Sequence, residues 1–258
     1  VDGAASAGAA AGMPPAAAAA ITQLSQLPAG YPSQPPARKA EGGDRHVRHP
    51  DLAQTWLEAL PEANTEDGCT RVLHVTNVDT NYCTTDMLAI LFGVYGDVIK
   101  VKILSSREAA LIQFAYPAMA FFARQHLDGC PLLGRNLAIA YSSQVGINDP
   151  SAADLTSRPT LRRFSATTSP SDPMYQDHLV PPTNTLKFLF HENKNAPDEE
   201  LKKLLAKGCE VTEMKRISPA EVLVQVASVE AAVSGIIMTH GQLLGGVVLS
   251  VCFTLETI

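Results

Sequence analysis

The sequence lacks a surplus of positive charge, because 20 Lys and Arg stand against 26 Asp and Glu, for a net charge of −6. This balance excludes tight polyanion binding that depends mainly on a large basic field. The deficit is uneven: residues 1–69 carry 4 basic against 8 acidic residues, and residues 70–147 carry 6 against 5. Residues 148–182 carry 3 against 4, and residues 183–258 carry 7 against 9. The near-neutral region from 70 to 147 still allows a site built from specific contacts.

Other absences narrow the class of protein. The five cysteines are dispersed, with no C-x-x-C pair and no histidine at metal-ligand spacing, which favours reduced intracellular thiols. No apolar run approaches the ~20 residues of a membrane span, and the Ala-rich start lacks the features of a signal peptide. Glycine loops for phosphate, nucleophile elbows and paired carboxylates are also missing. We therefore predict a soluble intracellular protein that is not an enzyme, with no cofactor, metal or membrane contact.

The N-terminal region divides into two parts. Residues 1–48 are mainly Ala, Gly, Pro, Ser and Gln, and such a segment buries too little surface to offset its ordering entropy, so disorder is predicted. In residues 49–69, Leu52, Trp56 and Leu60 recur every four positions and predict a short helix. That helix either docks on its own chain or binds a partner protein. A first residue other than Met suggests a fragment or a processed product.

From residue 70 the sequence alternates like a strand and then becomes helical, in the order β-α-β-β-α-β. Strands are expected in "RVLHVTNV", "DVIKVKIL", "EAALIQFA" and "RNLAIAYS". Helices are expected in "DMLAILFGVYG", with Thr84 or Thr85 as the cap, and in "PAMAFFARQHL", where Pro117 suits the first turn. We call residues 70–147 domain one.

The same order returns after residue 182. Strands are expected in "TLKFLF", "EVTEMKRI", "EVLVQVA" and "GVVLSVCF", and helices in "PDEELKKLLAKG" and "VEAAVSGIIMTH". The segment "LIQFA" at 111–115 recurs as "LVQVA" at 223–227, which indicates an internal repeat. Residues 183–258 are therefore domain two. The predicted fold class is α+β, with two ferredoxin-like β-α-β-β-α-β domains, each a four-stranded antiparallel sheet with two helices on one face.

The third strand of domain one departs from a known pattern. The RNA-recognition motif (RRM) has this element order, and its third strand is close to K/R-G-F/Y-G/A-F-V-x-F/Y, in which two inner aromatics stack bases. In "REAALIQF", from Arg107 to Phe114, the positions of those rings are taken by Ala109 and Leu111. The sheet has either lost RNA binding or reads RNA in another way.

Residues 70–258 resemble the C-terminal pair of RRMs of the polypyrimidine-tract-binding protein and heterogeneous nuclear ribonucleoprotein L family. The likeness is closest at "ILFGVYGDVIKVKIL", with "VLHVTNV" before it and "ALIQF" after it, and it persists through "LTSRPTLRRF" and "VPPTNTL". The resemblance implies sheets that lack stacking aromatics and still bind short, single-stranded, pyrimidine-rich RNA. It also implies that the two domains pack through their helical faces. The linker, residues 148–182, supplies apolar anchors for such packing in Leu155, Leu161, Phe164, Leu179 and Val180.

The resemblance carries RNA contacts onto strand one, strand two and the exit of strand four. The RNA-binding residues predicted in domain one are His74, Thr76, Lys102, Leu104, Ser105, Leu111, Gln113, Ser142, Ser143 and Gln144. Ala109 and Leu111 would form an apolar floor for bases, and polar groups past strand four would read the base edges. Alternatives stay open, because His74 and Lys102 could be solvated side chains and Gln113 could form an amide pair across strands.

Domain two departs further from an RNA-binding surface. Its predicted contacts are Lys187, at the position of His74, with Leu223 and Gln225. Glu221 stands where Ala109 does, and a carboxylate on the sheet repels phosphate. Domain two is therefore expected to bind RNA weakly or to meet a protein instead.

These observations predict a non-enzymatic protein that binds CU-rich single-stranded RNA, mainly through domain one, and regulates mRNA splicing, processing or stability. The expected location is the nucleus, the cytoplasm or both, with protein partners at the N-terminal segment or domain two. The alternative is a scaffold whose RRM-like domains bind proteins without reading RNA. Missing aromatics, low basicity and Glu221 favour the scaffold, whereas His74 and Lys102 favour RNA.

Overall fold

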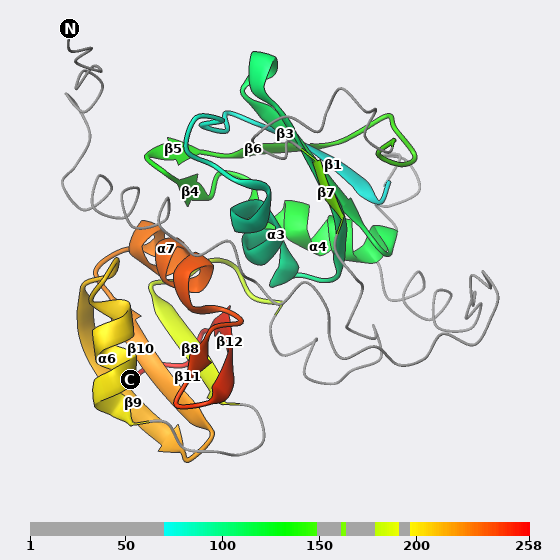
Figure 1. Ribbon diagram of the computed structural model, residues 1–258. Coiled ribbons are helices and arrows are strands. Elements are labelled where there is room, and N and C mark those ends of the chain that lie inside the picture. The colour runs from blue at the N-terminus through cyan, green and yellow to red at the C-terminus, as the bar shows by residue number, and fades with distance from the viewer. Residues whose placement is uncertain (1–69, 149–160, 164–178, 191–196) are drawn as a thin grey trace, which may run out of the picture.

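The computed structural model (Figure 1) describes four stretches of the chain: residues 70–148, 161–163, 179–190 and 197–258. The disorder predicted for residues 1–48 and the helix predicted within residues 49–69 lie outside these stretches. Of the helices described, none is both long and apolar enough to cross a membrane. Within the same stretches, no group of three His, Cys, Asp or Glu side chains could hold a metal ion.

Domain one has the predicted β-α-β-β-α-β order. Its elements are β1 (Val72–Thr76), α3 (Thr85–Gly93), β2 (Val98–Leu104), β3 (Ala109–Phe114), α4 (Pro117–Leu127) and β6 (Ala138–Tyr141). The strands pair antiparallel in the order β6-β1-β3-β2, and α3 and α4 cover one face of the sheet (Figure 1). Alternate strand residues such as Leu73 and Ile112 are buried against the helices. The residues between them point to the opposite side, which we call the outer face.

Local sequence explains where α3 begins and why α4 can pack closely against the end of α3. Thr84 is the N-cap of α3, and its hydroxyl oxygen accepts a hydrogen bond from Met87 N–H at 3.2 Å. Gly96, just past α3, has a φ of +146°, and a Cβ built there would lie 2.4 Å from Cγ of Met119 in α4. Because a glycine has no Cβ, it permits both the backbone angle and the contact.

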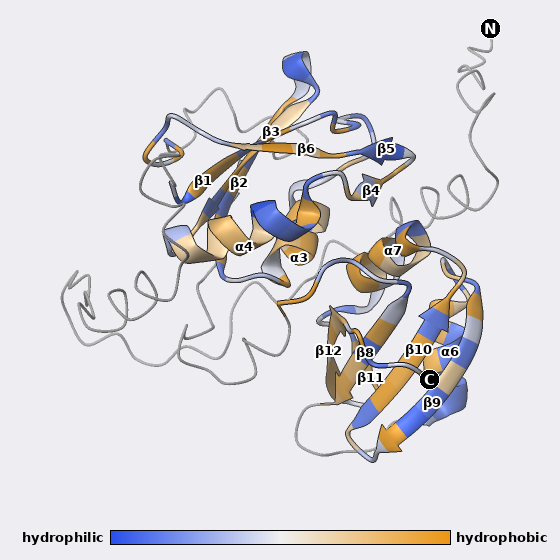
Figure 2. Ribbon diagram, turned by 180° about the vertical axis from the view of Figure 1, so that it is seen from behind, coloured by the Kyte–Doolittle hydropathy of each residue, from blue (hydrophilic) through white to orange (hydrophobic). Residues whose placement is uncertain are grey.

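Domain two repeats the order of domain one. Its elements are β8 (Thr185–Phe190), α6 (Asp198–Leu205), β9 (Val211–Ser218), β10 (Glu221–Val226), α7 (Val229–Thr239) and β12 (Val247–Phe253). The strands pair antiparallel in the order β12-β8-β10-β9 (Figure 2), which is the strand order of domain one. α7 begins at the N-cap Ser228, whose hydroxyl oxygen accepts a hydrogen bond from Ala231 N–H at 3.1 Å.

Each sheet has one strand more than the four predicted. In domain one, β7 (Leu161–Arg163) pairs antiparallel with the outer edge of β2. In domain two, β11 (Leu243–Leu244) pairs with β12. A separate hairpin of β4 (Pro131–Leu132) and β5 (Arg135–Asn136) precedes β6. The prediction of a four-stranded antiparallel core is confirmed, and the added strands arise from the linker and from the turn before β12.

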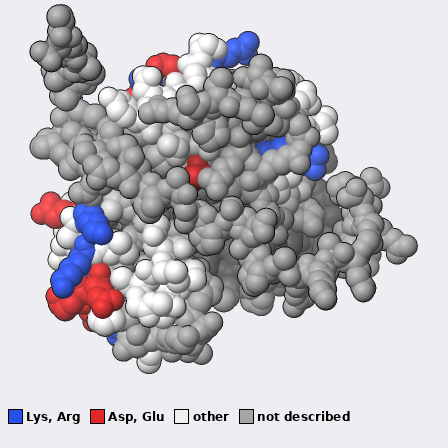
Figure 3. All heavy atoms as spheres, in the orientation of Figure 1, with Lys and Arg blue, Asp and Glu red and all other residues white. Residues whose placement is uncertain are grey.

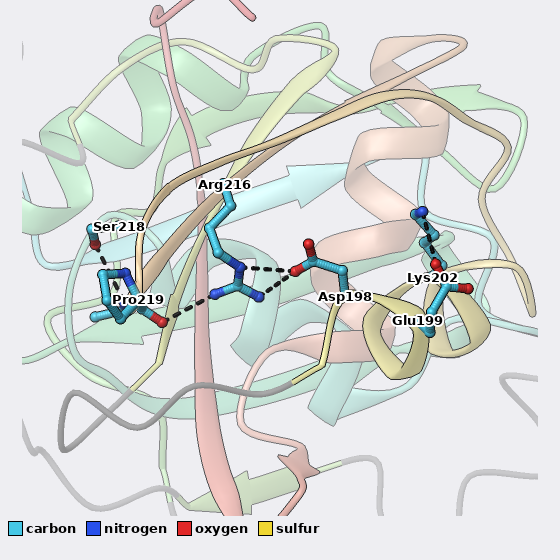
Figure 4. Close-up of polar contacts among 7 residues, drawn as sticks. Asp198, Glu199, Lys202, Arg216, Ser218 and Pro219 are labelled. Atoms are coloured by element: carbon cyan, nitrogen blue, oxygen red, sulfur yellow. Dashed lines mark hydrogen bonds and ion pairs between the residues drawn. The ribbon is translucent and has the colours of Figure 1, made fainter.

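On the helix side of domain two, Arg216 of β9 ties the sheet to α6 (Figure 4). Its Nε donates to Asp198 Oδ1 at 2.9 Å, its Nη2 donates to the same oxygen, and its Nη1 donates to the Pro219 carbonyl at 3.0 Å. On α6 itself, Lys202 pairs with Glu199 at 3.0 Å. In the view of Figure 3, acidic and basic groups gather together over this part of domain two. These ion pairs belong to the helical side, away from the outer face.

The two domains contact each other through their helices. α7 of domain two packs against α3 and β4 of domain one (Figure 1). Gly134 N–H donates to Glu230 Oε1 at 2.7 Å across this contact. The Tyr95 hydroxyl, which is buried, donates to the Val180 carbonyl at 2.9 Å. Because the helices lie on the inner side of each sheet, both outer faces stay clear of the contact between the domains.

The linker is described only in part. Leu179 and Val180 pack against the buried core, and Leu161 lies in β7. The other predicted anchors, Leu155 and Phe164, lie outside the described residues. The domain limits, and a linker packed along its whole length, therefore remain predictions.

Candidate nucleic-acid interface

The outer face of domain one is built from residues that the strand register sets side by side. In an antiparallel pair, directly opposed residues point to the same face. His74 on β1 is opposite both Ala140 on β6 and Leu111 on β3, and Leu111 is opposite Lys102 on β2. These four residues form a central row across the sheet. The row brings together three of the residues that the sequence predicted.

Two further rows flank the central one. On one side Thr76 is opposite Ala109, which is opposite Leu104. On the other side Val72 is opposite Gln113, which is opposite Lys100. Thr76, Leu104 and Gln113 therefore share the face of His74, Leu111 and Lys102, as the alternation along each strand predicted.

Residues 142–148, which we call the crossing segment, lie over this face. They leave β6 at one edge of the sheet, and β7 pairs with β2 at the other edge. Arg71 Nε donates to the Val145 carbonyl at 3.1 Å, and Lys100 Nζ donates to the Ile147 carbonyl at 3.0 Å. Ile147 N–H donates to Gln113 Oε1 at 2.7 Å. Cations and an amide of the sheet thus hold the backbone of the segment in place.

The crossing segment changes what the sheet offers to a ligand. The Ile147 side chain packs on Leu111 and Val72, so Leu111 is 7% exposed and Gln113 is 4% exposed. Ala109 is buried as well. The apolar floor that the sequence predicted therefore lies largely beneath Ile147. A contact between Gln113 and a base stays a prediction, and it requires the segment to move.

A cleft of about 300 Å³ opens between the crossing segment and the turn that joins β2 to β3. Its lining residues are Lys102, Leu104, Ser106, Arg107, Leu111, Gln144, Ile147 and Asn148. Four of them, Lys102, Leu104, Leu111 and Gln144, were predicted from the sequence. The cleft has an apolar wall, two cations and two amide side chains. Such a set can hold a flat heterocycle and bond to its edge.

Sequence reasoning missed part of this lining. Ser106 and Arg107 lie in a 3-10 turn, Ser105–Arg107, next to the predicted Ser105, whose own side chain does not line the cleft. Asn148 was assigned to the linker. Neither position has a periodic signal, because turn residues face a site only through the path of the chain around them. His74 and Thr76 lie on the same face but outside the lining.

Among the described residues, no carboxylate forms an ion pair with the cations of the cleft. Lys102 and Arg107 make no ion pair within the described residues, whereas the neighbouring Glu108 pairs with Arg135 at 3.1 Å. Arg135 also lies 3.9 Å from Asp79. The acidic groups near the turn are therefore engaged with Arg135, and the cleft keeps a local positive charge in a domain that is nearly neutral.

The exit of β6 is fixed by a small set of hydrogen bonds. The Thr70 hydroxyl donates to the Val72 carbonyl at 2.9 Å and to the Ser142 carbonyl at 3.0 Å. The Gln144 N–H donates to Ser142 Oγ at 3.1 Å. Ser142 is buried, whereas Ser143 and Gln144 are exposed. Ser142 therefore acts by positioning Gln144, and its predicted RNA contact remains untested.

The exit of β12 in domain two has the same construction. The Thr183 hydroxyl donates to the Thr185 carbonyl at 2.8 Å and to the Thr254 carbonyl at 2.9 Å. The Glu256 N–H donates to Thr254 Oγ1 at 3.1 Å. Thr183, Thr254 and Glu256 thus take the roles of Thr70, Ser142 and Gln144, and the repeat extends to individual hydrogen bonds.

The outer face of domain two has the same central row with different residues. Lys187 on β8 is opposite Cys252 on β12 and Leu223 on β10, and Leu223 is opposite Lys215 on β9. Gln225 lies in the next row, opposite Thr185. Lys215 was not among the predicted contacts, although it follows Lys102 by 113 residues, which is the spacing of Lys187 from His74.

Lys187 is engaged by carboxylates. Its Nζ donates to Glu256 Oε1 at 2.8 Å and lies 4.0 Å from Glu221 Oε1. The hydrogen bond to Glu256 is the main reason that the pKa of Lys187 lies above its ordinary value, and burial opposes it. Leu223 beside it is 1% exposed. Domain two therefore presents a paired lysine where domain one presents a histidine.

The described residues offer no activated thiol. Cys83, Cys130, Cys209 and Cys252 are buried and unbridged. Burial raises the pKa of each of these thiols to about 12, so the thiolate is scarce at neutral pH. Both domains therefore use their cysteines as small apolar side chains.

Comparison with known proteins agrees with this architecture. Residues 53–166 match the model of the RNA recognition motif family, also called the RRM, RBD or RNP domain. Polypyrimidine tract-binding protein homolog 3 of Arabidopsis thaliana is 26% identical over 230 residues, which are 84% of this chain and 51% of that protein. The chain thus spans about half the length of this curated relative.

Two solved structures are similar to this chain at low identity and low TM-score. The Sxl-lethal protein/RNA complex is 14% identical with a TM-score of 0.26, covering 70% of this chain and 98% of that one. The first two RRM domains of yeast poly(U) binding protein are 20% identical with a TM-score of 0.25, covering 72% of this chain and 100% of that one.

The element order and the strand order of both domains are those of the RRM, and residues 53–166 match the family model of that domain. The chain is also similar, over 84% of its length, to a polypyrimidine tract-binding protein homolog, in agreement with the resemblance seen in the sequence.

Proposed function

We propose that the chain binds single-stranded, CU-rich RNA and that the outer face of domain one is the main reader. The cleft beside the crossing segment is the observation that carries this proposal. It combines an apolar wall at Leu104 and Leu111 with the amide of Gln144 and with two cations, Lys102 and Arg107, that form no ion pair within the described part of the chain. A base can lie against the wall, the amide can bond to its edge, and the cations can meet the phosphates on either side.

The absence of stacking aromatics fits this mode of binding. A cleft closed by Ile147 on one side replaces the ring that an aromatic residue would supply. Because few cations take part, the salt dependence of binding should be shallow. Base contacts, more than backbone charge, would then set the preference for pyrimidines.

Fluorescence anisotropy with short CU-rich and A-rich RNAs at two salt concentrations tests the proposal. Tighter binding of CU-rich RNA with a shallow salt slope is the expected result. If both RNAs bind equally and salt abolishes the binding, the interaction is only a weak charge attraction. That result would contradict sequence-selective binding of RNA.

A scaffold function is the second candidate, and one observation favours it for domain two. Glu256 and Glu221 engage Lys187, so this lysine has little to offer a phosphate, and of the two lysines in the central row only Lys215 is left exposed. If neither RNA binds in the anisotropy experiment, the scaffold becomes the better account of the whole chain.

The cellular role follows from the RNA ligand. A protein that binds pyrimidine tracts and performs no chemistry acts by recruiting or excluding other factors, so we place it in the regulation of mRNA splicing, processing or stability. The nucleus, the cytoplasm or both are the corresponding locations, with protein partners at the N-terminal segment or domain two.

A further inference from the structure

The two domains differ at one position whose backbone is held in the same way in both. Gln144 N–H donates to Ser142 Oγ at 3.1 Å, and Glu256 N–H donates to Thr254 Oγ1 at 3.1 Å. Both residues come two positions after the residue whose carbonyl accepts the threonine hydroxyl. Glu256 is therefore the counterpart of Gln144 in geometry as well as in sequence order.

The two side chains do opposite things at this shared position. Gln144 lines the cleft of domain one beside Lys102, as a neutral amide. Glu256 instead places its carboxylate 2.8 Å from Lys187 Nζ, in the central row of the outer face of domain two. Glu221 adds a second carboxylate 4.0 Å from the same ammonium. One cation thus faces two anions on the surface where RNA would lie.

We propose that Glu256 closes the outer face of domain two to RNA, because its carboxylate occupies the Lys187 ammonium that a phosphate or a base carbonyl would otherwise reach. The residue three positions after the end of β6 or β12 then decides which domain binds RNA. Glutamine admits RNA in domain one, and glutamate excludes it in domain two. The inference rests on the proposed function, since it names the residue that restricts RNA to domain one.

Repulsion and competition act together in this arrangement. An incoming phosphate must displace a hydrogen-bonded carboxylate and then share the surface with it. A glutamine at residue 256 would keep the shape of the side chain and remove the charge. The Glu256 side chain is 47% exposed, so this substitution leaves the core of domain two unchanged.

The test uses the whole chain with His74→Ala and Lys102→Ala to silence domain one. On this background Glu256→Gln should raise the affinity for a CU-rich RNA by about ten-fold, since a freed lysine can make a charge-assisted hydrogen bond. The salt slope should steepen by about 0.7, the value for one added phosphate contact on a single strand. Adding Lys187→Ala should abolish both gains.

Glu199→Gln is the matched control. Glu199 pairs with Lys202 at 3.0 Å, so its substitution makes the same charge change and also frees a lysine, but on α6, on the helical side of the sheet (Figure 4). No gain is expected from it. An equal gain from both variants, or no gain from Glu256→Gln, would overturn the inference.

The unmodified chain is measured in parallel, so that two failures can be told apart. If it binds CU-rich RNA while Glu256→Gln adds nothing on the silenced background, only the role of Glu256 is wrong. If the unmodified chain does not bind, the proposed function fails. A gain from Glu256→Gln in that case would still support the exclusion of RNA by Glu256.

Discussion

Domain one and domain two place a lysine opposite a leucine at the centre of the outer face, as Lys102 with Leu111 and as Lys215 with Leu223. The third member of the row differs, since His74 in one domain is Lys187 in the other. The frame is fixed by alternate buried residues and by backbone hydrogen bonds, which tolerate many side chains on the other face. We infer that the proposed RNA binding depends on a few exposed positions that folding does not constrain.

The edges of the two sheets differ as well. The β2 edge of domain one is extended by β7, and the chain crosses the outer face to reach it. In the described part of domain two, β9 is the last strand of its sheet, and the residues after β12 run beside Lys187 instead. One domain therefore has a walled cleft, whereas the other has a surface on which carboxylates neutralise one of the two lysines of the central row.

The largest effects are expected in the cores, where the two domains are alike. Leu73→Ala and its counterpart Leu186→Ala each remove a fully buried side chain and should lower the free energy of unfolding by about 2–5 kcal/mol. Because α7 packs on α3, each substitution should shift a single unfolding transition in urea, followed by circular dichroism. Two transitions, of which only one moves, would show that the domains unfold independently.

The next largest effect is expected in RNA affinity, which should respond to a substitution in the outer face of domain one and not to one in domain two. His74→Ala should weaken binding of CU-rich RNA by roughly 1–3 kcal/mol if the imidazole stacks on a base, whereas Lys187→Ala should leave it unchanged. Anisotropy titrations of the two variants beside the unmodified chain measure the difference. Unchanged affinity in His74→Ala would remove this residue from the site, and equal losses would place both faces in contact with RNA.

A smaller effect is expected when the hydrogen bond that holds the crossing segment on the sheet is removed. Gln113→Ala removes the acceptor of the Ile147 N–H and should speed hydrogen exchange of that amide about five-fold, the equivalent of about 1 kcal/mol. Gln225→Ala changes the matching glutamine of domain two and should leave the Ile147 amide unaffected. The Ser142 amide, which donates to the Val72 carbonyl, serves as an internal reference. Equal exchange of the Ile147 amide in the unmodified chain and in Gln113→Ala would mean that this bond does not hold the segment.

The smallest effect concerns Glu221, the more distant of the two carboxylates near Lys187. Glu221→Ala should raise RNA binding by domain two by no more than about three-fold, or leave it unchanged, because exposed ion pairs at this range are weak. The same anisotropy titration measures it on the background with domain one silenced. A clear loss of affinity would show that Glu221 favours RNA binding, which is the opposite of the effect expected here.

Much of the fold could be predicted because it follows from local rules. The alternation of Leu73 and Val75 around His74 gave both the strand and the direction of the histidine side chain. The Thr84 cap has a local signature that needs no tertiary information. Because the sequence repeats after 112 to 113 residues, the same strands and helices could also be predicted in domain two.

The missed features depend on where distant segments meet. β7 has three residues in a polar and proline-rich linker, too few for a period to show, and it forms because the β2 edge is available. Ile147 covers Leu111 only because the chain crosses the sheet. Glu256 lies past the last strand. Its equivalence to Gln144 is recognised only from the matching hydrogen bonds that the two backbone N–H groups make in the structure.

We propose that CU-rich RNA binds the outer face of domain one and leaves domain two untouched. A titration of the ¹⁵N-labelled whole chain with CU-rich RNA tests it most directly, because the matched amides of Lys102 and Lys215, and of Gln144 and Glu256, report on the two faces at once. The account predicts shifts at Lys102 and Gln144, with no change at Lys215 and Glu256. Equal shifts in both pairs, or shifts confined to domain two, would contradict it.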